Sequence, residues 1–386
     1  MHVRHLGLVD FRSYEELELD LGAGVTTFVG ANGQGKTNLI EAIGYAATLR
    51  SHRVATDAPL VRHGAPRAIV RTEVDRDGRS VLVELEITPG RANRARLNRA
   101  PVPRQRDVLG QVSRVLFCPE DLSLVKGDPS DRRGYLDELL VALAPRFDAT
   151  LSDLDRVLRQ RNSLLKSAGA LRGGGSRARM AAEQTLSVWD DQLAELSGDL
   201  IAARSVLVGR LAEPMGQRYR AVAPDDRDPQ PVVSYVSGVP GAAELSRREA
   251  ADHVRAELLR RRDEEFARGL TLVGPHRDEL ALSLHGLPVR GYASHGESWS
   301  MALSLRLASY DLIQADSGPG GDPILVLDDV FAELDSTRRE RLATAVQEVE
   351  QVLITAAVGD DVPASLSGRI VDVAASRVFL EGAGDE

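Results

Sequence analysis

The sequence predicts an α/β fold in which a mainly α-helical insertion divides one mixed domain into two parts. A glycine-rich loop stands between a β-rich run and a helical pattern near residue 30, and apolar residues recur at helical spacing between residues 136 and 207. Short alternating strands resume near residue 269, and a later apolar strand ends in two adjacent carboxylates. We therefore expect the first part at residues 1–125, the insertion at residues 126–265 and the second part at residues 266–386.

Composition limits the class of protein. A single cysteine, Cys118, excludes an internal disulfide framework and suits a reducing compartment. The first residues lack the apolar segment of a signal peptide, and no apolar run approaches the ~20 residues that cross a bilayer. We expect a cytoplasmic protein without a membrane partner. The net charge of −9 argues against broad non-specific nucleic-acid binding, so any nucleic acid would need a local basic patch.

The glycine-rich loop is a complete phosphate-binding motif. Residues 30–37 read Gly-Ala-Asn-Gly-Gln-Gly-Lys-Thr, which matches G-x-x-x-x-G-K-[ST]. In such a loop backbone N–H groups surround the α- and β-phosphates, the lysine contacts the β/γ-phosphates and the threonine hydroxyl is a ligand for Mg²⁺. Residues 25–29 predict a strand before the loop and residues 38–43 a helix after it, so phosphate would meet a helix N-terminus. The sequence predicts a nucleoside triphosphate site formed by Gly30, Ala31, Asn32, Gly33, Gln34, Gly35, Lys36 and Thr37.

The insertion is expected to form an antiparallel helical hairpin. Leucines from Leu136 to Leu165 recur at steps of three and four residues, residues 173–176 interrupt the pattern with glycine, and a second leucine series runs from Leu186 to Leu207. The proline-rich residues 224–231 predict an exposed loop. Beyond it, residues 270–273 and 280–284 predict strands.

The second chemical motif is the apolar strand at residues 324–327, which ends in Asp328 and Asp329. Ligands meet an open α/β sheet at the carboxyl ends of its buried strands. Asp328 is expected to hold Mg²⁺ together with Thr37, and Asp329 to orient or deprotonate the attacking water. Acids are common at such strand ends, so this interpretation depends on the complete phosphate-binding loop.

Taken in order, these motifs resemble the ATP-binding cassette (ABC) class, and within it the RecF family of bacterial recombination-repair proteins. Further motifs carry the resemblance: Phe11-Arg-Ser-Tyr14, Phe117-Cys-Pro-Glu-Asp-Leu122, Leu124-Val-Lys-Gly127 with Arg132-Arg133, and Leu272-Val-Gly-Pro-His-Arg-Asp278. The resemblance implies an ABC-type P-loop ATPase head with an inserted mainly α-helical hairpin domain, and ATP and Mg²⁺ as cofactors. It also implies an ATP-dependent homodimer that binds duplex DNA near gaps and single-strand/duplex junctions. Weak, DNA-dependent ATP hydrolysis would release the DNA, and RecR, RecO and RecA would be partners.

The same resemblance implies a signature loop that completes the ATP site of the partner subunit. The candidate residues are Ser294, Gly296 and Glu297; without the resemblance, Ser294 reads as an ordinary helix N-cap. The family usually has glutamine where Glu297 stands, so ATP-driven dimerisation is expected to be weaker here. Residues 352–358 lack the switch histidine of many ABC ATPases, which leaves Thr355 as a partial substitute.

Six arginines lie within sixteen residues that contain no acid: Arg91, Arg94, Arg96, Arg99, Arg104 and Arg106. In a hairpin they would form a positive edge suited to DNA phosphates, and a solvated charged hairpin is the alternative.

Three other classes of protein fit the sequence less well. A P-loop metabolic enzyme that does not act on DNA would need a second substrate constellation, and we find neither a Cys/His pair nor a metal cluster in the sequence. A GTPase would carry an Asn-Lys-x-Asp element, which is absent. An SMC-like coiled-coil protein would need a longer insertion, because about 40 residues per arm span only ~60 Å.

Overall fold

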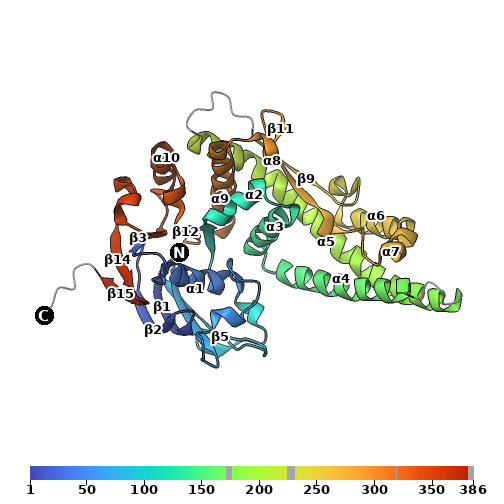
Figure 1. Ribbon diagram of the computed structural model, residues 1–386, viewed down its shortest axis with the longest axis horizontal. Helices are drawn as coiled ribbons and strands as arrows, with labels where there is room; N and C mark the ends of the chain where they lie inside the picture. The colour runs from blue at the N-terminus through green and yellow to red at the C-terminus, as the bar shows by residue number, and fades with distance from the viewer. Residues whose placement is uncertain (171–175, 224–230, 319, 381–386) are drawn as a thin grey trace. The chain divides into compact units, whose positions relative to one another are not determined.

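The computed structural model describes residues 1–170, 176–223, 231–318 and 320–380, which form two compact units (Figure 1). Unit 1 comprises Met1–Val125, Pro214–Pro229 and Ala293–Glu386, and unit 2 comprises Lys126–Glu213 and Gln230–Tyr292. Unit 2 continues to Tyr292, and the long helix α5 (Ser176–Val222) enters unit 1 at Pro214.

A mostly parallel six-stranded sheet carries both chemical motifs of unit 1. Its strand order is β15-β14-β3-β13-β12-β8, with only the edge strand β15 antiparallel. The strands are β3 (Gly24–Val29), β8 (Arg114–Phe117), β12 (Ile324–Asp328), β13 (Gln351–Ala356), β14 (Arg369–Ala374) and β15 (Arg377–Leu380). Every residue of β12 and β13 is buried, as expected for central strands covered on both faces. The strands predicted at residues 25–29 and 324–327 are therefore present.

The second sheet of unit 1 is antiparallel, with the order β2-β1-β4-β5-β6-β7. Its strands are β1 (His2–Phe11), β2 (Tyr14–Asp20), β4 (Ala68–Arg76), β5 (Arg79–Ile87), β6 (Arg94–Leu97) and β7 (Ala100–Pro101). Helix α1 (Lys36–Thr48) contacts strands of both sheets and buries Leu39, Ile40 and Ile43 between them. The core of unit 1 therefore forms around the helix that follows the phosphate-binding loop.

Two further helices of unit 1 carry residues of interest. Helix α9 (His295–Ser317) begins at the predicted signature loop, and α10 (Ser336–Val346) follows the acid pair. Asp121 in the turn before α2 (Leu122–Lys126) accepts hydrogen bonds from Arg306 of α9 at 2.7 and 3.0 Å. The Phe117–Leu122 motif thus anchors α9 to the end of β8.

Unit 2 contains the helical insertion and a small sheet of order β11-β10-β9. Its helices are α3 (Pro129–Leu143), α4 (Phe147–Ala170), most of α5, α6 (Arg247–Arg260), α7 (Arg262–Arg268) and α8 (Val289–Tyr292). Its strands are β9 (Pro231–Val236), β10 (Glu279–Leu284) and β11 (Leu287–Pro288). The glycine turn at residues 173–175 and most of the loop at 224–231 lie outside the described residues.

The predicted strand at residues 280–284 corresponds to β10, whereas the strand predicted at residues 270–273 is wrong. That segment gives its backbone N–H groups to side chains instead of to a neighbouring strand. Thr271 N donates to Asn162 Oδ1 at 2.7 Å, and Leu272 N donates to Glu265 Oε1 at 2.7 Å.

Two sequence motifs without a catalytic interpretation meet in unit 2. Arg132 pairs with Glu279 at 2.6 and 2.9 Å, and Arg133 donates to the carbonyl of Asp278 at 2.8 Å. The carboxylate of Asp278 is buried and accepts hydrogen bonds from Arg204 at 2.7 Å and from Gly238 N at 2.8 Å. These residues join the start of α3 to the start of β10, which is a structural role.

Candidate nucleotide-binding site

The phosphate-binding loop connects β3 to α1, as the sequence predicts, and two of its glycines are required by geometry. Gly35 adopts φ of 111°, a conformation that other residues rarely tolerate. A Cβ on Gly30 would lie 2.2 Å from the carbonyl oxygen of Val373 on β14. The loop therefore curls tightly against the sheet and presents the N-terminus of α1 to any bound phosphate.

Lys36 is a buried cation at the start of α1. Its side chain folds back over the loop, where Nζ donates to the carbonyl oxygens of Gly30 at 2.6 Å and Ala31 at 3.3 Å. Among the described residues no carboxylate pairs with it. Because a buried ammonium gains most from an anionic partner, this position is suited to a phosphate.

Thr37 and Asp328, predicted to share a metal ion, lie together. Thr37 Oγ1 donates to Asp328 Oδ1 at 3.2 Å, and Thr355 Oγ1 donates to the same oxygen at 2.6 Å. The sheet explains the meeting: Asp328 pairs with Thr355, and Thr355 pairs with Phe28 near the end of β3. The carboxyl ends of the three parallel strands thus reach the same edge.

These residues fit a magnesium ion by their chemistry. All are oxygen donors, which Mg²⁺ prefers. Burial raises the pKa of Asp328 to about 6, and the neighbouring charge of Asp329 adds to the shift despite the hydrogen bonds from Thr355 and Thr37. A divalent cation would stabilise the charged carboxylate, so this edge of the sheet can hold one through Asp328 and Thr37.

Asp329 differs from its neighbour in conformation. Its φ of 50° lies in the left-handed region, so its side chain does not continue the alternation between the two sheet faces that the residues of β12 follow. Its backbone N donates to Thr355 Oγ1 at 2.9 Å. Thr355 therefore bonds to both aspartates, from the strand where ABC ATPases often carry a switch histidine.

His52 is a site residue that the sequence reasoning missed. It follows α1, and its Nε2 lies 3.9 Å from Asp328 Oδ2 without a hydrogen-bond partner among the described residues. Burial, with Arg114 nearby, lowers the pKa of His52 to about 4, so the ring is neutral near pH 7. The run Ser51-His52-Arg53 was the available signal, but only the fold brings it to the acid pair.

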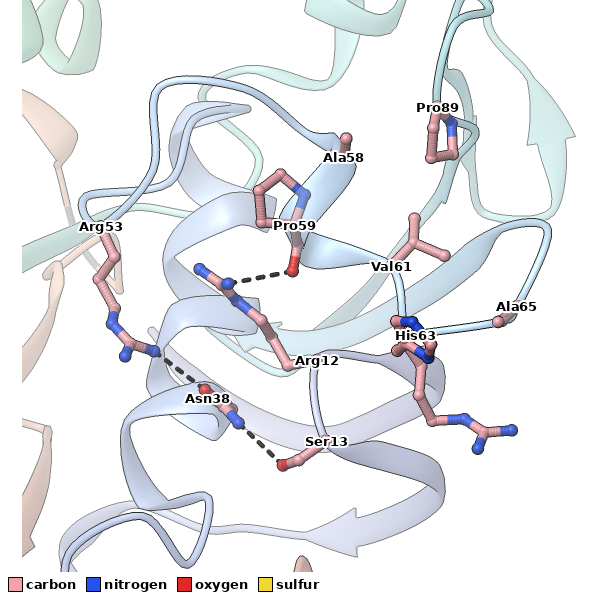
Figure 2. A pocket seen from close by; sticks show the side chains of 12 residues that line it. Arg12, Ser13, Asn38, Arg53, Ala58, Pro59, Val61, His63, Ala65 and Pro89 are labelled. Carbon is pink, nitrogen blue, oxygen red and sulfur yellow. Dashed lines mark hydrogen bonds between the residues drawn. The ribbon is translucent and has the colours of Figure 1, made fainter.

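An open pocket of about 640 Å³ adjoins the first turn of α1. On one side Arg53 donates to Asn38 Oδ1 at 3.0 Å and Asn38 donates to Ser13 Oγ at 2.9 Å, while Arg12 donates to the carbonyl of Pro59 at 3.0 Å (Figure 2). Apolar parts of the lining come from Val61, Ala65 and Pro89. Asn38 follows Thr37 directly in the first turn of α1, so the pocket lies next to the end of the phosphate-binding loop.

The buried carboxylate of Glu41 holds two of the arginines in that pocket. Arg12 donates to both of its oxygens at 2.6 and 2.7 Å, and Ser51 and Arg53 approach at 2.5 and 3.5 Å. Burial acts to raise the pKa of Glu41, but the hydrogen bonds from Arg12 and Ser51 outweigh it and hold the pKa below its usual value. Glu41 therefore remains an anion that positions the pocket's cations.

The predicted signature loop, residues 294–297, begins α9 with a capping box. Ser294 Oγ accepts from Glu297 N at 3.2 Å, and Glu297 Oε2 accepts from Ser294 N at 2.6 Å. The carboxylate that departs from the family pattern thus turns back onto its own helix. Ser294 is exposed and Gly296 is partly exposed.

The six predicted DNA-contacting arginines lie at the edge of the antiparallel sheet. Five are exposed, and Arg106 is half-buried within the turn at Gln105–Val108. On β6, Arg94 faces Glu86 and Arg96 faces Glu84 across the strand pair. The same two acids form ion pairs with other arginines: Glu86 with Arg67, just before β4, at 3.2 Å, and Glu84 with Arg71 of β4 at 3.5 Å. The arginine segment itself contains no acid, but the neighbouring strand places two glutamates opposite it. Part of the positive charge of this edge is therefore offset.

No helix among the described residues is both long and apolar enough to span a membrane. Nor does that part of the chain gather three or more His, Cys, Asp or Glu side chains into a metal cluster.

Comparison with known proteins places the chain in a family. The family described as RecF/RecN/SMC N terminal domain matches residues 2–366. A protein of Frankia alni is 58% identical over 385 residues (98% of this chain, 99% of its own length), and one of Kineococcus radiotolerans is 57% identical over 384 residues (96% and 97%). Both are named DNA replication and repair protein RecF. A solved structure described as the recombination mediator protein RecF-ATPrS in the RecFOR pathway matches with a TM-score of 0.88 at 25% identity, covering 99% of this chain and 98% of that one. The chain has the ABC ATPase fold and belongs to the RecF family of DNA replication and repair proteins.

Proposed function

We propose that this chain is an ATP-gated DNA clamp of the recombination-repair machinery. ATP closes a homodimer on duplex DNA near a single-strand gap, and slow hydrolysis releases it. The observation that carries the proposal is the convergence of Thr37 and Thr355 on the buried Asp328, beside a buried lysine without an acidic partner among the described residues. The buried lysine would be stabilised by an anion and the buried aspartate by a cation, and ATP·Mg²⁺ supplies both.

Each part of the nucleotide has a partner in this site. Residues 30–37 surround the phosphates, Lys36 neutralises the β/γ-phosphates, and Thr37 with Asp328 holds Mg²⁺. Asp329 positions the water that attacks the γ-phosphate. The pocket bounded by Arg12, Asn38 and Arg53 takes the nucleoside, since it adjoins the loop at Asn38.

The signature loop acts in trans. Ser294 and Gly296 at the start of α9 approach the γ-phosphate bound by a second copy, in a two-fold dimer with two such sites. The capping role of Glu297 supports this, because its carboxylate bonds to Ser294 N at 2.6 Å instead of projecting toward the phosphate. The carboxylate of Glu297 would therefore repel the γ-phosphate less than a carboxylate that points toward it.

The proposed DNA and protein partners are inferred from the relatives of this chain. Relatives are named DNA replication and repair proteins, and one solved relative is described as a recombination mediator in the RecFOR pathway. We infer that the chain acts in the cytoplasm with RecO and RecR to help load RecA at gapped DNA. The arginine edge is the proposed DNA contact, and DNA is expected to stimulate a weak ATPase.

The decisive experiment measures ATP turnover and sedimentation of the full chain, each with and without gapped duplex. The proposal expects an ATP-dependent dimer and turnover that rises with DNA. A chain that stays monomeric with ATP and hydrolyses it indifferently to DNA would instead favour a P-loop enzyme that does not act on DNA.

A further inference from the structure

Arg338 of α10 lies directly against the signature loop. A Cβ built on Gly296 would be 2.5 Å from Arg338 Nη2 and 2.8 Å from its Cζ, so the guanidinium occupies the space that any side chain there would need. Arg338 Nε also donates to Ser300 Oγ, one turn into α9, at 3.2 Å. Glycine at position 296 therefore lets a cation pack against the start of the helix.

The same side chain is fixed at its other end by Asp335. Arg338 Nη1 pairs with that carboxylate, and Arg338 N donates to Asp335 Oδ1 at 3.0 Å, which caps α10. Asp335 stands at the end of the short segment that follows Asp329. One guanidinium thus links the start of α9 to the segment beyond the proposed catalytic acid.

The charge of Arg338 suits this position. Glu297 places a negative charge in the first turn of α9, and the guanidinium beside Gly296 offsets it. A planar guanidinium also matches phosphate oxygens better than an ammonium does. Its neighbour Arg339 points elsewhere, donating to the carbonyl of Leu334 at 2.9 Å and lying 3.7 Å from Asp361. The side chain of Arg338 is 19% exposed, so it is positioned yet accessible.

We propose that Arg338 is a working part of the signature site: it presents a guanidinium beside Gly296 to the triphosphate held by a second copy of the chain. Through Asp335 it also connects that contact to the segment after Asp329. This inference rests on the proposed ATP-dependent dimer and adds to it a ligand for the nucleotide in trans.

Three variants test the assignment against a purely structural role. Arg338→Ala should leave the monomer's ATP affinity within about twofold of wild type and weaken the ATP-dependent dimer at least tenfold, as expected for loss of a charge-assisted contact. Arg338→Lys should recover part of that loss, and Arg339→Ala should dimerise normally. Melting temperatures without nucleotide identify any variant that fails to fold, and Arg338→Lys then carries the test.

Mixing two defective chains decides whether Arg338 acts across the interface. Consider a mixed dimer of one Lys36→Ala chain and one Arg338→Ala chain. If Arg338 acts on the ATP held by its partner, one ATP site contains both substitutions and the other contains neither. Gapped-DNA-stimulated turnover should therefore appear in the mixture although neither variant shows it alone. If Arg338 serves its own subunit, no intact site forms and the mixture stays inactive, which overturns the inference. A wild-type chain that remains monomeric with ATP overturns the dimer as well.

Discussion

The two adjacent aspartates at the end of β12 differ in their surroundings. Asp328 is buried and accepts hydrogen bonds from two threonines, whereas Asp329 is half-buried and held by its backbone to Thr355 in the left-handed region. Similar carboxylates in different environments take different tasks. At the residue scale this separation supports a metal role for Asp328 and a water-positioning role for Asp329.

Lys36→Ala should weaken ATP binding at least tenfold, a loss of about 1.4 kcal/mol or more. The variant removes the cation that faces the β/γ-phosphates and leaves the carbonyls of Gly30 and Ala31 facing them instead. Equilibrium titration with ATP and with AMP measures the effect. Affinity for AMP serves as the control, since AMP lacks the phosphates that Lys36 contacts. Unchanged ATP affinity would contradict the assignment.

Asp329→Asn should bind ATP normally and lose turnover by roughly 10²-fold or more. Asparagine keeps the shape of aspartate and tolerates a φ of 50°, so the backbone of the site is preserved while the base is lost. Dimers formed with ATP should persist, because hydrolysis no longer dissolves them. Single-turnover rates with sedimentation check both effects, and a normal rate would show that another group positions the water.

At the scale of elements, local pattern predicted the strands and helices that carry the motifs, because their periodicity is set by neighbours in sequence. The strand expected at residues 270–273 is absent because the side chains of Asn162 and Glu265 accept hydrogen bonds from the backbone N–H groups of Thr271 and Leu272. The phosphate-binding loop and the acid pair could likewise be predicted, because each is a short contiguous motif. The positions of His52 and Arg338 could not be predicted, since each contacts residues that are distant in sequence.

Ser294→Arg should abolish ATP-dependent dimers while the monomer still binds ATP. The exposed Ser294 begins α9, so a bulky cation there would block the approach of a second copy's γ-phosphate. Sedimentation with a slowly hydrolysed ATP analogue measures the dimer. Gln192→Arg, at an exposed position of α5, is a control for an added surface charge. Dimers of normal stability in Ser294→Arg would remove this residue from the interface.

Replacing Arg94, Arg96 and Arg99 with Glu should weaken duplex binding and flatten its salt dependence, by roughly 0.9 in log–log slope per lost phosphate contact. Glu84 and Glu86 lie opposite β6, so new acids would also repel across the strand pair. The matching Arg→Gln triple removes the charges without that repulsion. Affinity for gapped duplex at several salt concentrations is the measurement.

The control for this edge is a triple change of Arg156, Arg159 and Arg260 to Glu, which alters net charge equally on exposed helical positions. An unchanged salt slope in the β6 variants would make the arginine edge a solvated surface. The DNA path would then be sought near Arg50 and Arg53.

At the scale of the whole molecule, each proposed ATP site draws on two chains. Turnover should therefore rise more steeply than in proportion to protein concentration until the dimer is saturated. Initial rates across a dilution series at fixed ATP and DNA test this. The mixed Lys36→Ala and Arg338→Ala sample should show the same steepness, and strict proportionality in the wild type would mean that one chain suffices.

The left-handed backbone at Asp329 also has a genetic consequence. After glycine, asparagine and aspartate adopt that conformation most readily, and Asp→Asn requires a single G-to-A transition in either aspartate codon. By the proposed roles, a chain that folds, binds ATP and fails to release is therefore one base change from the wild type. In a cell with both alleles it would enter mixed dimers and hold them on DNA. We expect the Asp329→Asn allele to be dominant, and a plasmid copy should sensitise a wild-type strain to DNA damage.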